Sequence, residues 1–187
     1  YNEVTSIANY LLSSGIQKGD KIAILSANMP NWGITQFAIA RIGAIAVPVL
    51  PGFSSIEIQN ILEHSESKII FVSKLLYKLV ADIKTSYLEQ KILMNTFARI
   101  PEDYPVEAID KLENNIGLNN LTPLPAIQVE EEDTASIIYT SGTTGFSKGV
   151  ELTHRNLVWN ARQCATIQPV STQDRFLSIL PCLLYTS

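Results

Sequence analysis

The chain has 187 residues, of which 46% are hydrophobic and 17% charged, and its formal net charge at pH 7 is −4. This composition is typical of a globular domain with a sizeable core and excludes a disordered chain, and the acidic balance argues against a surface that binds nucleic acid. The sequence contains only two cysteines, Cys164 and Cys182. They are too few for a disulfide framework, so we expect a reducing, cytoplasmic location.

The N-terminal half of the sequence predicts alternating helices and strands. Helices are expected over 3–14, 31–42, 55–65 and 74–84, and strands over 21–26, 44–49, 68–72 and 91–94. Gly15 marks the end of the first helix, and Ser54 is a good N-cap for the third. Alternation of this kind indicates an α/β fold with a doubly wound, mostly parallel sheet and flanking helices.

Residues 96–130 interrupt this alternation, because they contain Pro101, Pro105, Pro123 and Pro125. We expect a surface excursion there, with one short helix around 106–114. The acidic run 130–133 follows it. A metal site is one interpretation of that run, but a solvated entrance to the next strand is favoured, since charge runs are usually exposed. We therefore assign no metal ligand.

Residues 139–150, Tyr-Thr-Ser-Gly-Thr-Thr-Gly-Phe-Ser-Lys-Gly-Val, have the composition of a loop that grips phosphate. The two loop glycines allow tight turns and bring backbone N–H groups close to an anion, and the hydroxyl groups can donate to phosphate oxygens. The lysine adds a positive point charge. The candidate nucleotide-binding residues are Thr140, Ser141, Gly142, Thr143, Thr144, Gly145 and Lys148.

The flanks of this run predict two strands. Residues 135–139 are apolar and partly β-branched, residues 149–152 alternate, and a helix begins only after Thr153, a plausible N-cap. The common P-loop has Gly-x-x-x-x-Gly-Lys-Ser/Thr followed by a helix. This chain has Ser147 where that pattern needs glycine and Gly149 where it needs a hydroxyl group. A P-loop phosphotransferase is therefore disfavoured.

Other residues with functional chemistry are more simply explained by structure. We expect core packing for Tyr139, Trp32 and Trp159, a buried position for Cys164, a surface position for His64 and local bonding at a helix start for His154. Stacking on a nucleotide is the alternative for Tyr139, and a phosphate contact is the alternative for His154.

The run 139–150 resembles the signature of the adenylate-forming superfamily, Tyr-Thr-Ser-Gly-Thr-Thr-Gly-x-Pro-Lys-Gly-Val. Only the usual proline is replaced, by Ser147, which removes a residue that would stiffen the loop. Further segments are similar to the same superfamily: 19–25, 28–32, 43–49 and 152–157. Residues 174–181 resemble the corresponding segment of long-chain fatty acid–CoA ligases.

This resemblance implies part of the large N-terminal domain of an AMP-forming synthetase. It implies activation of a carboxylic acid by ATP and Mg²⁺, followed by thioester formation with coenzyme A, with a long-chain fatty acid as the expected substrate. Lys148 would stabilise the leaving pyrophosphate, whereas the main catalytic lysine of the family would lie outside this chain. An adenylation domain, an aryl-CoA ligase or a non-catalytic nucleotide-binding remnant are the alternatives. A membrane surface is a further candidate partner, although no basic amphipathic stretch of the sequence indicates one.

The two parts of the chain have different expected origins. Residues 1–181 are expected to be a partial N-terminal AMP-binding domain, which would be inactive alone. Residues 182–187, Cys-Leu-Leu-Tyr-Thr-Ser, are what TGT-CTC-TTA-TAC-ACA-TCT encodes, a string contained in a sequencing-library adapter. The family usually has histidine at the position of Leu184 and, in its long-chain members, glutamate at that of Ser187. We therefore expect 182–187 to be translated adapter.

Overall fold

The computed structural model describes residues 2–113, 116, 120–140, 148–167, 171 and 173–175. Its strands are β1 (Lys21–Leu25), β2 (Ile45–Pro48), β3 (Ile69–Val72), β4 (Gln90–Leu93), β5 (Ala98–Ile100), β6 (Thr134–Thr140) and β7 (Lys148–Thr153). Its α-helices are α1 (Asn2–Ser13), α2 (Pro30–Arg41), α3 (Ser55–His64) and α4 (His154–Ile167). Two 3₁₀-helices, η1 (Lys74–Leu79) and η2 (Val106–Lys111), complete the described elements.

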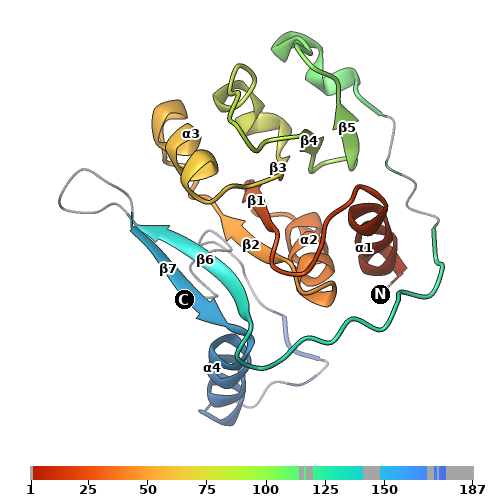
Figure 1. Cartoon of the computed structure of the whole chain (residues 1–187), viewed down its shortest axis with the longest axis vertical. Coiled ribbons are helices and arrows are strands. Elements are labelled where there is room, and N and C mark those ends of the chain that lie inside the picture. Colours follow the sequence, from red (N-terminus) through yellow and green to blue (C-terminus); the bar gives the residue numbers. More distant parts are fainter. Residues whose placement is uncertain are drawn as a thin grey trace.

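The strands form a 7-stranded sheet in the order β5-β4-β3-β1-β2-β6-β7 (Figure 1). The inner pairs β4–β3, β3–β1, β1–β2 and β2–β6 are parallel, and the outer strands β5 and β7 are antiparallel to their neighbours. All four residues of β3 are buried, as expected for a parallel strand that is covered on both faces. The predicted α/β fold with a doubly wound, mostly parallel sheet is confirmed.

Alternate side chains of the central strands enter two separate cores. In β1, Ile22 and Ile24 pack with residues of α1 and α2, whereas Ala23 and Leu25 pack with residues of α3 and η1. Figure 1 shows α1 and α2 on one side of the sheet and α3 on the other. The period of two along a strand thus distributes one hydrophobic run between two helical layers.

The start of α3 follows directly from its sequence. Ser54 Oγ accepts a hydrogen bond from Glu57 N at 3.3 Å, and Glu57 Oε2 accepts one from Ser54 N at 2.8 Å. This reciprocal capping box satisfies two backbone donors that have no partner within the helix. The predicted N-cap is therefore confirmed, and it fixes where the helix begins.

The predicted α-helix over 74–84 is wrong in type and length, because η1 is a 3₁₀-helix that ends at Leu79. The buried side chains of this segment are Tyr77, Val80 and Ile83, which recur every three residues. This spacing matches the 3.0 residues per turn of a 3₁₀-helix. The same spacing also fits one side of an α-helix, which explains the wrong prediction.

The segment 96–130 is only partly a surface excursion. Phe97, at φ 54°, turns the chain back, and β5 then pairs with β4. Ala98 and Ile100 are buried and Arg99 is exposed. This strand was not predicted, because three residues are too few for a clear alternation of buried and exposed side chains. The short helix expected around 106–114 is present as η2.

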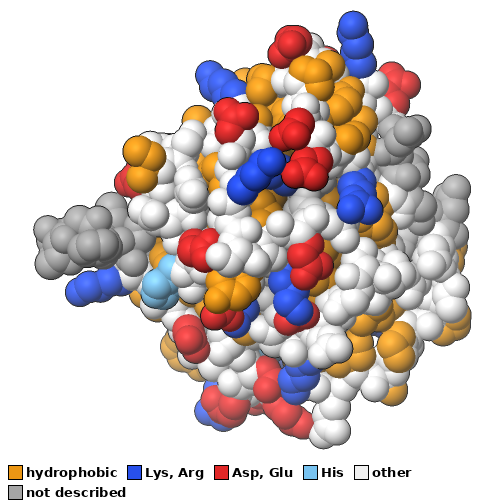
Figure 2. All heavy atoms as spheres, turned by 45° about the horizontal axis from the view of Figure 1, so that its top comes forward, with side chains coloured by type: hydrophobic (Ala, Val, Ile, Leu, Met, Phe, Trp, Pro, Cys, Tyr) orange, Lys and Arg blue, Asp and Glu red, His pale blue; other side chains and the backbone are white. Residues whose placement is uncertain are grey.

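The face of the fold shown in Figure 2 mixes charges of both signs. Figure 2 shows acidic and basic side chains interspersed over the face in view, and the described residues of that face form no large region of one sign. The described residues in this view thus form no basic stripe. Among the described residues, no helix combines the length and apolar character needed to cross a membrane.

Candidate functional site

The candidate phosphate loop connects the two strands of an antiparallel hairpin at one edge of the sheet (Figure 1). Strands β6 and β7 pair from Thr134↔Thr153 to Thr140↔Lys148, with a register shift between Thr134 and Ser136. The predicted order of strand, loop, strand and then helix is confirmed. The described element that follows the run 141–147 is thus a strand, whereas in the common P-loop it is a helix whose N-terminus supports phosphate.

Two of the candidate nucleotide-binding residues lie within the described chain. Thr140 ends β6, Lys148 begins β7, and the two are directly opposite and exposed. The remaining candidates, Ser141, Gly142, Thr143, Thr144 and Gly145, lie outside the described residues. Directly opposed residues project from the same side of an antiparallel pair, about 5 Å apart at Cβ. A hydroxyl group and an ammonium group can therefore reach the same anion at this end of the hairpin.

Tyr139 lies next to this pair and packs across both strands. It is 2% exposed and lies opposite Gly149. A Cβ atom on Gly149 would lie 3.2 Å from Tyr139 Cζ and 2.9 Å from Ile137 Cγ2, so the glycine leaves the space that these side chains occupy. The predicted core role of Tyr139 is confirmed. Burial, with a smaller effect from Glu151, raises the pKa of its phenol, so the group is a neutral hydrogen-bonding hydroxyl at pH 7.

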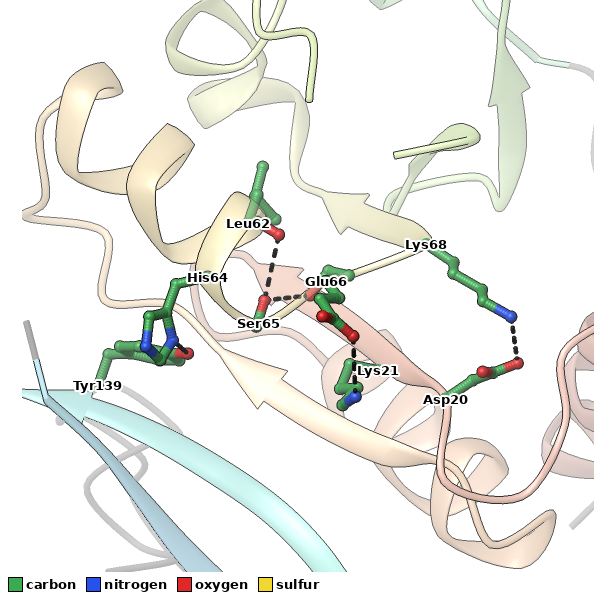
Figure 3. Close-up of polar contacts among 9 residues, drawn as sticks. Asp20, Lys21, Leu62, His64, Ser65, Glu66, Lys68 and Tyr139 are labelled. Carbon is green, nitrogen blue, oxygen red and sulfur yellow. Dashed lines mark hydrogen bonds and ion pairs between the residues drawn. The ribbon is translucent and has the colours of Figure 1, made fainter. Parts of the chain in front are cut away.

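His64, at the end of α3, contacts this tyrosine. Its Nδ1 lies 2.7 Å from Tyr139 Oη (Figure 3). The two rings pack edge to face, with their centroids 5.7 Å apart and an angle of 86° between their planes. His64 is exposed, as expected, but its hydrogen bond was not anticipated. The two residues are 75 positions apart. No local sequence signal reports such a contact.

His154 lies at the other end of the hairpin from the candidate loop. Strand β7 separates it from Lys148 by about 20 Å of extended chain, which argues against a phosphate contact. Its backbone N donates at 3.1 Å to the O atom of Asp133, a residue on the other side of the hairpin, so this bond is not the local one that was expected. Within the described structure its Nε2 atom is buried without a hydrogen-bond partner, and burial lowers the pKa of the imidazole.

The acidic run 130–133 makes ion pairs at this same end. Asp133 Oδ2 lies 2.6 Å from Lys18 Nζ, and this hydrogen bond is the main cause of a lowered pKa of the Asp133 carboxyl. Arg155 contacts both Glu131 and Glu132. In the described part of the chain, no group of three or more His, Cys, Asp or Glu side chains is placed to hold a metal ion.

Helix α4 corrects two expectations. Trp159 is 63% exposed and Cys164 is exposed, although a core anchor and a buried residue were predicted. None of the described residues of α4 is buried. The sequence shows that a residue is apolar, but its burial depends on what covers that side of the helix.

Comparisons with known proteins agree with this geometry. The model of the AMP-binding enzyme family matches residues 1–187. Crotonobetaine/carnitine–CoA ligase of Citrobacter koseri is 35% identical over 186 residues, which cover 96% of this chain and 34% of that protein. The structure of a Mycobacterium tuberculosis fatty acyl CoA synthetase is 25% identical with a TM-score of 0.76, over 96% of this chain and 33% of that one.

A third protein, a long-chain-fatty-acid–CoA ligase from Archaeoglobus fulgidus, is 27% identical with a TM-score of 0.69, over 92% of this chain and 32% of that one. The chain thus spans roughly a third of the length of each of these relatives. The family match covers the whole chain, and the strand–loop–strand hairpin lies where the signature predicts it. The chain therefore belongs to the AMP-binding enzyme family.

Proposed function

We propose that the complete protein is an AMP-forming acyl-CoA ligase. The observation that carries this proposal is the opposed pair Thr140 and Lys148, which borders the Gly-, Ser- and Thr-rich run 141–147 at the end of the hairpin. Membership of the AMP-binding enzyme family and the CoA ligases among the relatives support it.

In the first step, a carboxylate oxygen of the acid attacks the α-phosphorus of ATP. A bond forms between that oxygen and phosphorus, and the bond from the α-phosphorus to the oxygen that bridges to the β-phosphate breaks. The products are an acyl-adenylate and pyrophosphate. Negative charge increases on the leaving pyrophosphate, and Lys148 is proposed to stabilise it, while Thr140 and the run 141–147 position the phosphates.

Mg²⁺ fits this step as an ion that arrives with ATP, because phosphate oxygens are ligands that it prefers. The exposed hydroxyl group of Thr140 is compatible with that ion. When bound, Mg²⁺ would neutralise phosphate charge.

In the second step, the sulfur of coenzyme A attacks the acyl carbon. A carbon–sulfur bond forms, the bond between that carbon and the adenylate oxygen breaks, and AMP leaves. Adenylation is needed because a free carboxylate would have to expel oxide, whereas AMP is a good leaving group. No described residue is assigned to this step.

The acyl substrate is proposed to be a long-chain fatty acid. Residues 174–181 resemble the corresponding segment of long-chain ligases, and two of the structural relatives are named for fatty acyl substrates. Only Asp174 and Arg175 of that segment lie within the described residues. The 35% identity with crotonobetaine/carnitine–CoA ligase supports crotonobetaine or carnitine as a second candidate substrate.

We propose that the protein is cytoplasmic, and a membrane surface is a second proposed place of contact.

ATP–pyrophosphate exchange by the complete gene product tests this function. The acids to compare are a series of fatty acids of increasing length, crotonobetaine, carnitine and benzoate. Exchange that is highest with long-chain acids is expected. Highest exchange with crotonobetaine or benzoate would replace the proposed substrate, and an absence of exchange with every acid would favour a non-catalytic remnant.

Lys148→Ala is expected to lower exchange about 100-fold, since loss of one group that stabilises developing charge typically has this effect. Lys78→Ala removes another exposed lysine, in η1, and serves as the matched control. Equal exchange in the two variants would contradict the role of Lys148. The chain of 187 residues alone is expected to be inactive, because it spans only 34% of the length of the curated relative.

A further inference from the structure

We propose that His64 is a positioning residue for the phosphate-binding hairpin and acts through its hydrogen bond to Tyr139. This inference rests on the proposed adenylation function. His64 would not touch ATP. It would hold the end of the hairpin that carries Thr140 and Lys148 at a fixed place relative to the sheet.

Among the described residues, strand β6 has few backbone register pairs with its inner neighbour β2 near the end that carries Thr140. In the described part of the chain, the register between β2 and β6 consists of the single pair Ala46↔Ser136. Ser136 Oγ adds a hydrogen bond to Ala46 O at 3.1 Å. Beyond Ser136, β6 is held against the rest of the fold by its buried side chains Ile137, Ile138 and Tyr139. Apolar burial is non-directional, so a directed hydrogen bond near the end of β6 adds an orientation that burial alone does not fix.

Tyr139 is well placed to receive that contact. It directly precedes Thr140, and its ring occupies the space above Gly149, which directly follows Lys148. A fixed hydroxyl group on Tyr139 therefore restrains both strands at once. The hydrogen bond of 2.7 Å to His64 is the described link from this hydroxyl group to α3.

His64 is itself held by a well-anchored helix end. The preceding residues Ile61 and Leu62 are buried in the core. In the following turn, Ser65 Oγ lies 2.7 Å from Ser67 Oγ, and Lys68 Nζ lies 2.8 Å from Asp20 Oδ2, which precedes β1 (Figure 3). The hydrogen bond with Asp20 raises the pKa of the Lys68 ammonium group, so the lysine is charged at pH 7.

These contacts form a continuous path from the middle of the sheet to its edge. The path runs from β1 through the turn after α3 to His64, and then through Tyr139 to the end of the hairpin (Figure 3). Because the side chain of His64 is exposed, its replacement creates no cavity in the core. The expected consequence of that replacement is therefore a displaced hairpin in a folded protein.

The test uses the complete gene product in ATP–pyrophosphate exchange with its best acid. His64→Leu is expected to lower kcat about tenfold, the equivalent of one hydrogen bond, while KM for the acid stays unchanged. His64→Asn is expected to recover most of the loss, because its amide group can occupy the position of Nδ1. Asn60→Leu changes an exposed residue one turn earlier on α3 and is the matched control, with no expected effect.

Tyr139→Phe keeps the ring and removes the hydroxyl group, so it should reproduce the loss seen with His64→Leu. The double variant should then be no worse than either single variant, because both remove the same hydrogen bond. Additive losses would overturn the proposal.

The remaining outcomes separate this inference from the proposed function. An active wild-type protein with unchanged kcat in His64→Leu overturns the inference alone. Equal losses in His64→Leu and His64→Asn also overturn it, since a hydrogen bond would then not be the reason. A wild-type protein without exchange on any acid overturns the proposed function and, with it, this role of His64.

Discussion

Gly149→Ala should destabilise the protein, because the added methyl group has no room between β6 and β7. Its Cβ atom would lie 2.9 Å from Ile137 Cγ2, 3.2 Å from Tyr139 Cζ and 3.4 Å from Tyr139 Cε1. Carbon atoms at optimal contact are about 3.5–4.0 Å apart. Both neighbours belong to the core, with exposed fractions of 9% for Ile137 and 2% for Tyr139, so neither can swing into solvent.

The size of the effect follows from two opposing contributions. Overpacking of a well-filled site costs about 1–3 kcal/mol. Replacement of glycine by alanine also lowers the entropy of the unfolded chain, which stabilises the protein by about 0.4–1 kcal/mol. We therefore expect Gly149→Ala to lower the free energy of unfolding by about 1–2 kcal/mol.

Gly33→Ala provides a matched control with the opposite expected sign. Gly33 lies within α2, and a Cβ atom there would have no heavy atom within 4 Å. Alanine in a helix interior is favoured over glycine by about 0.5–1 kcal/mol. Urea denaturation of the chain of 187 residues would measure both variants as changes in midpoint at constant slope. A stabilised Gly33→Ala together with an unchanged or stabilised Gly149→Ala would refute the steric argument.

Three further predictions concern stability. Ser54→Ala should lower the free energy of unfolding by about 1 kcal/mol at pH 7, since it removes the N-cap of α3; an unchanged urea midpoint would contradict this. Hydrogen bonds from Ser54 lower the pKa of the Glu57 carboxyl, so the ionised carboxylate stabilises the fold at pH values above its unfolded pKa of 4.5. This contribution is lost as the pH falls through the lower pKa of the folded state. Urea midpoints measured from pH 7 to pH 3 should show the loss. Burial lowers the pKa of His154 below 6.5, so below that pH the unfolded chain binds a proton that the folded chain does not, and stability falls. Urea midpoints between pH 8 and pH 5 should decline less steeply in His154→Phe than in the wild type, and equal slopes would contradict the assignment.

The sequence predicted those parts of the fold whose signals are local. Ser54 could be recognised as an N-cap from the helical pattern that directly follows it, and its partner Glu57 lies only three positions later. The buried run 69–72 is long enough to show a parallel strand, and the pattern 135–152 was sufficient to predict a hairpin around the candidate loop. These features depend on residues that are close in the chain, so they can be predicted without knowledge of the tertiary structure.

Other features depend on contacts between distant segments. The hydrogen bond between His64 and Tyr139 exists only because α3 and β6 are brought together by the sheet order. The exposure of Trp159 depends on what lies against α4. In the case of η1, an apolar spacing of three suits two kinds of helix, and only packing decided between them.

The antiparallel pairing of β6 with β7 also determines where the chain can change length. Lys148 and Val150 project to one side of β7, and Gly149 and Glu151 project to the other, because strand side chains alternate. Deletion of one residue within β7 would exchange these sides and direct a lysine toward the ring of Tyr139. Related sequences should therefore keep a constant length within β7, just as the signature over 139–150 keeps a constant spacing between the two strands.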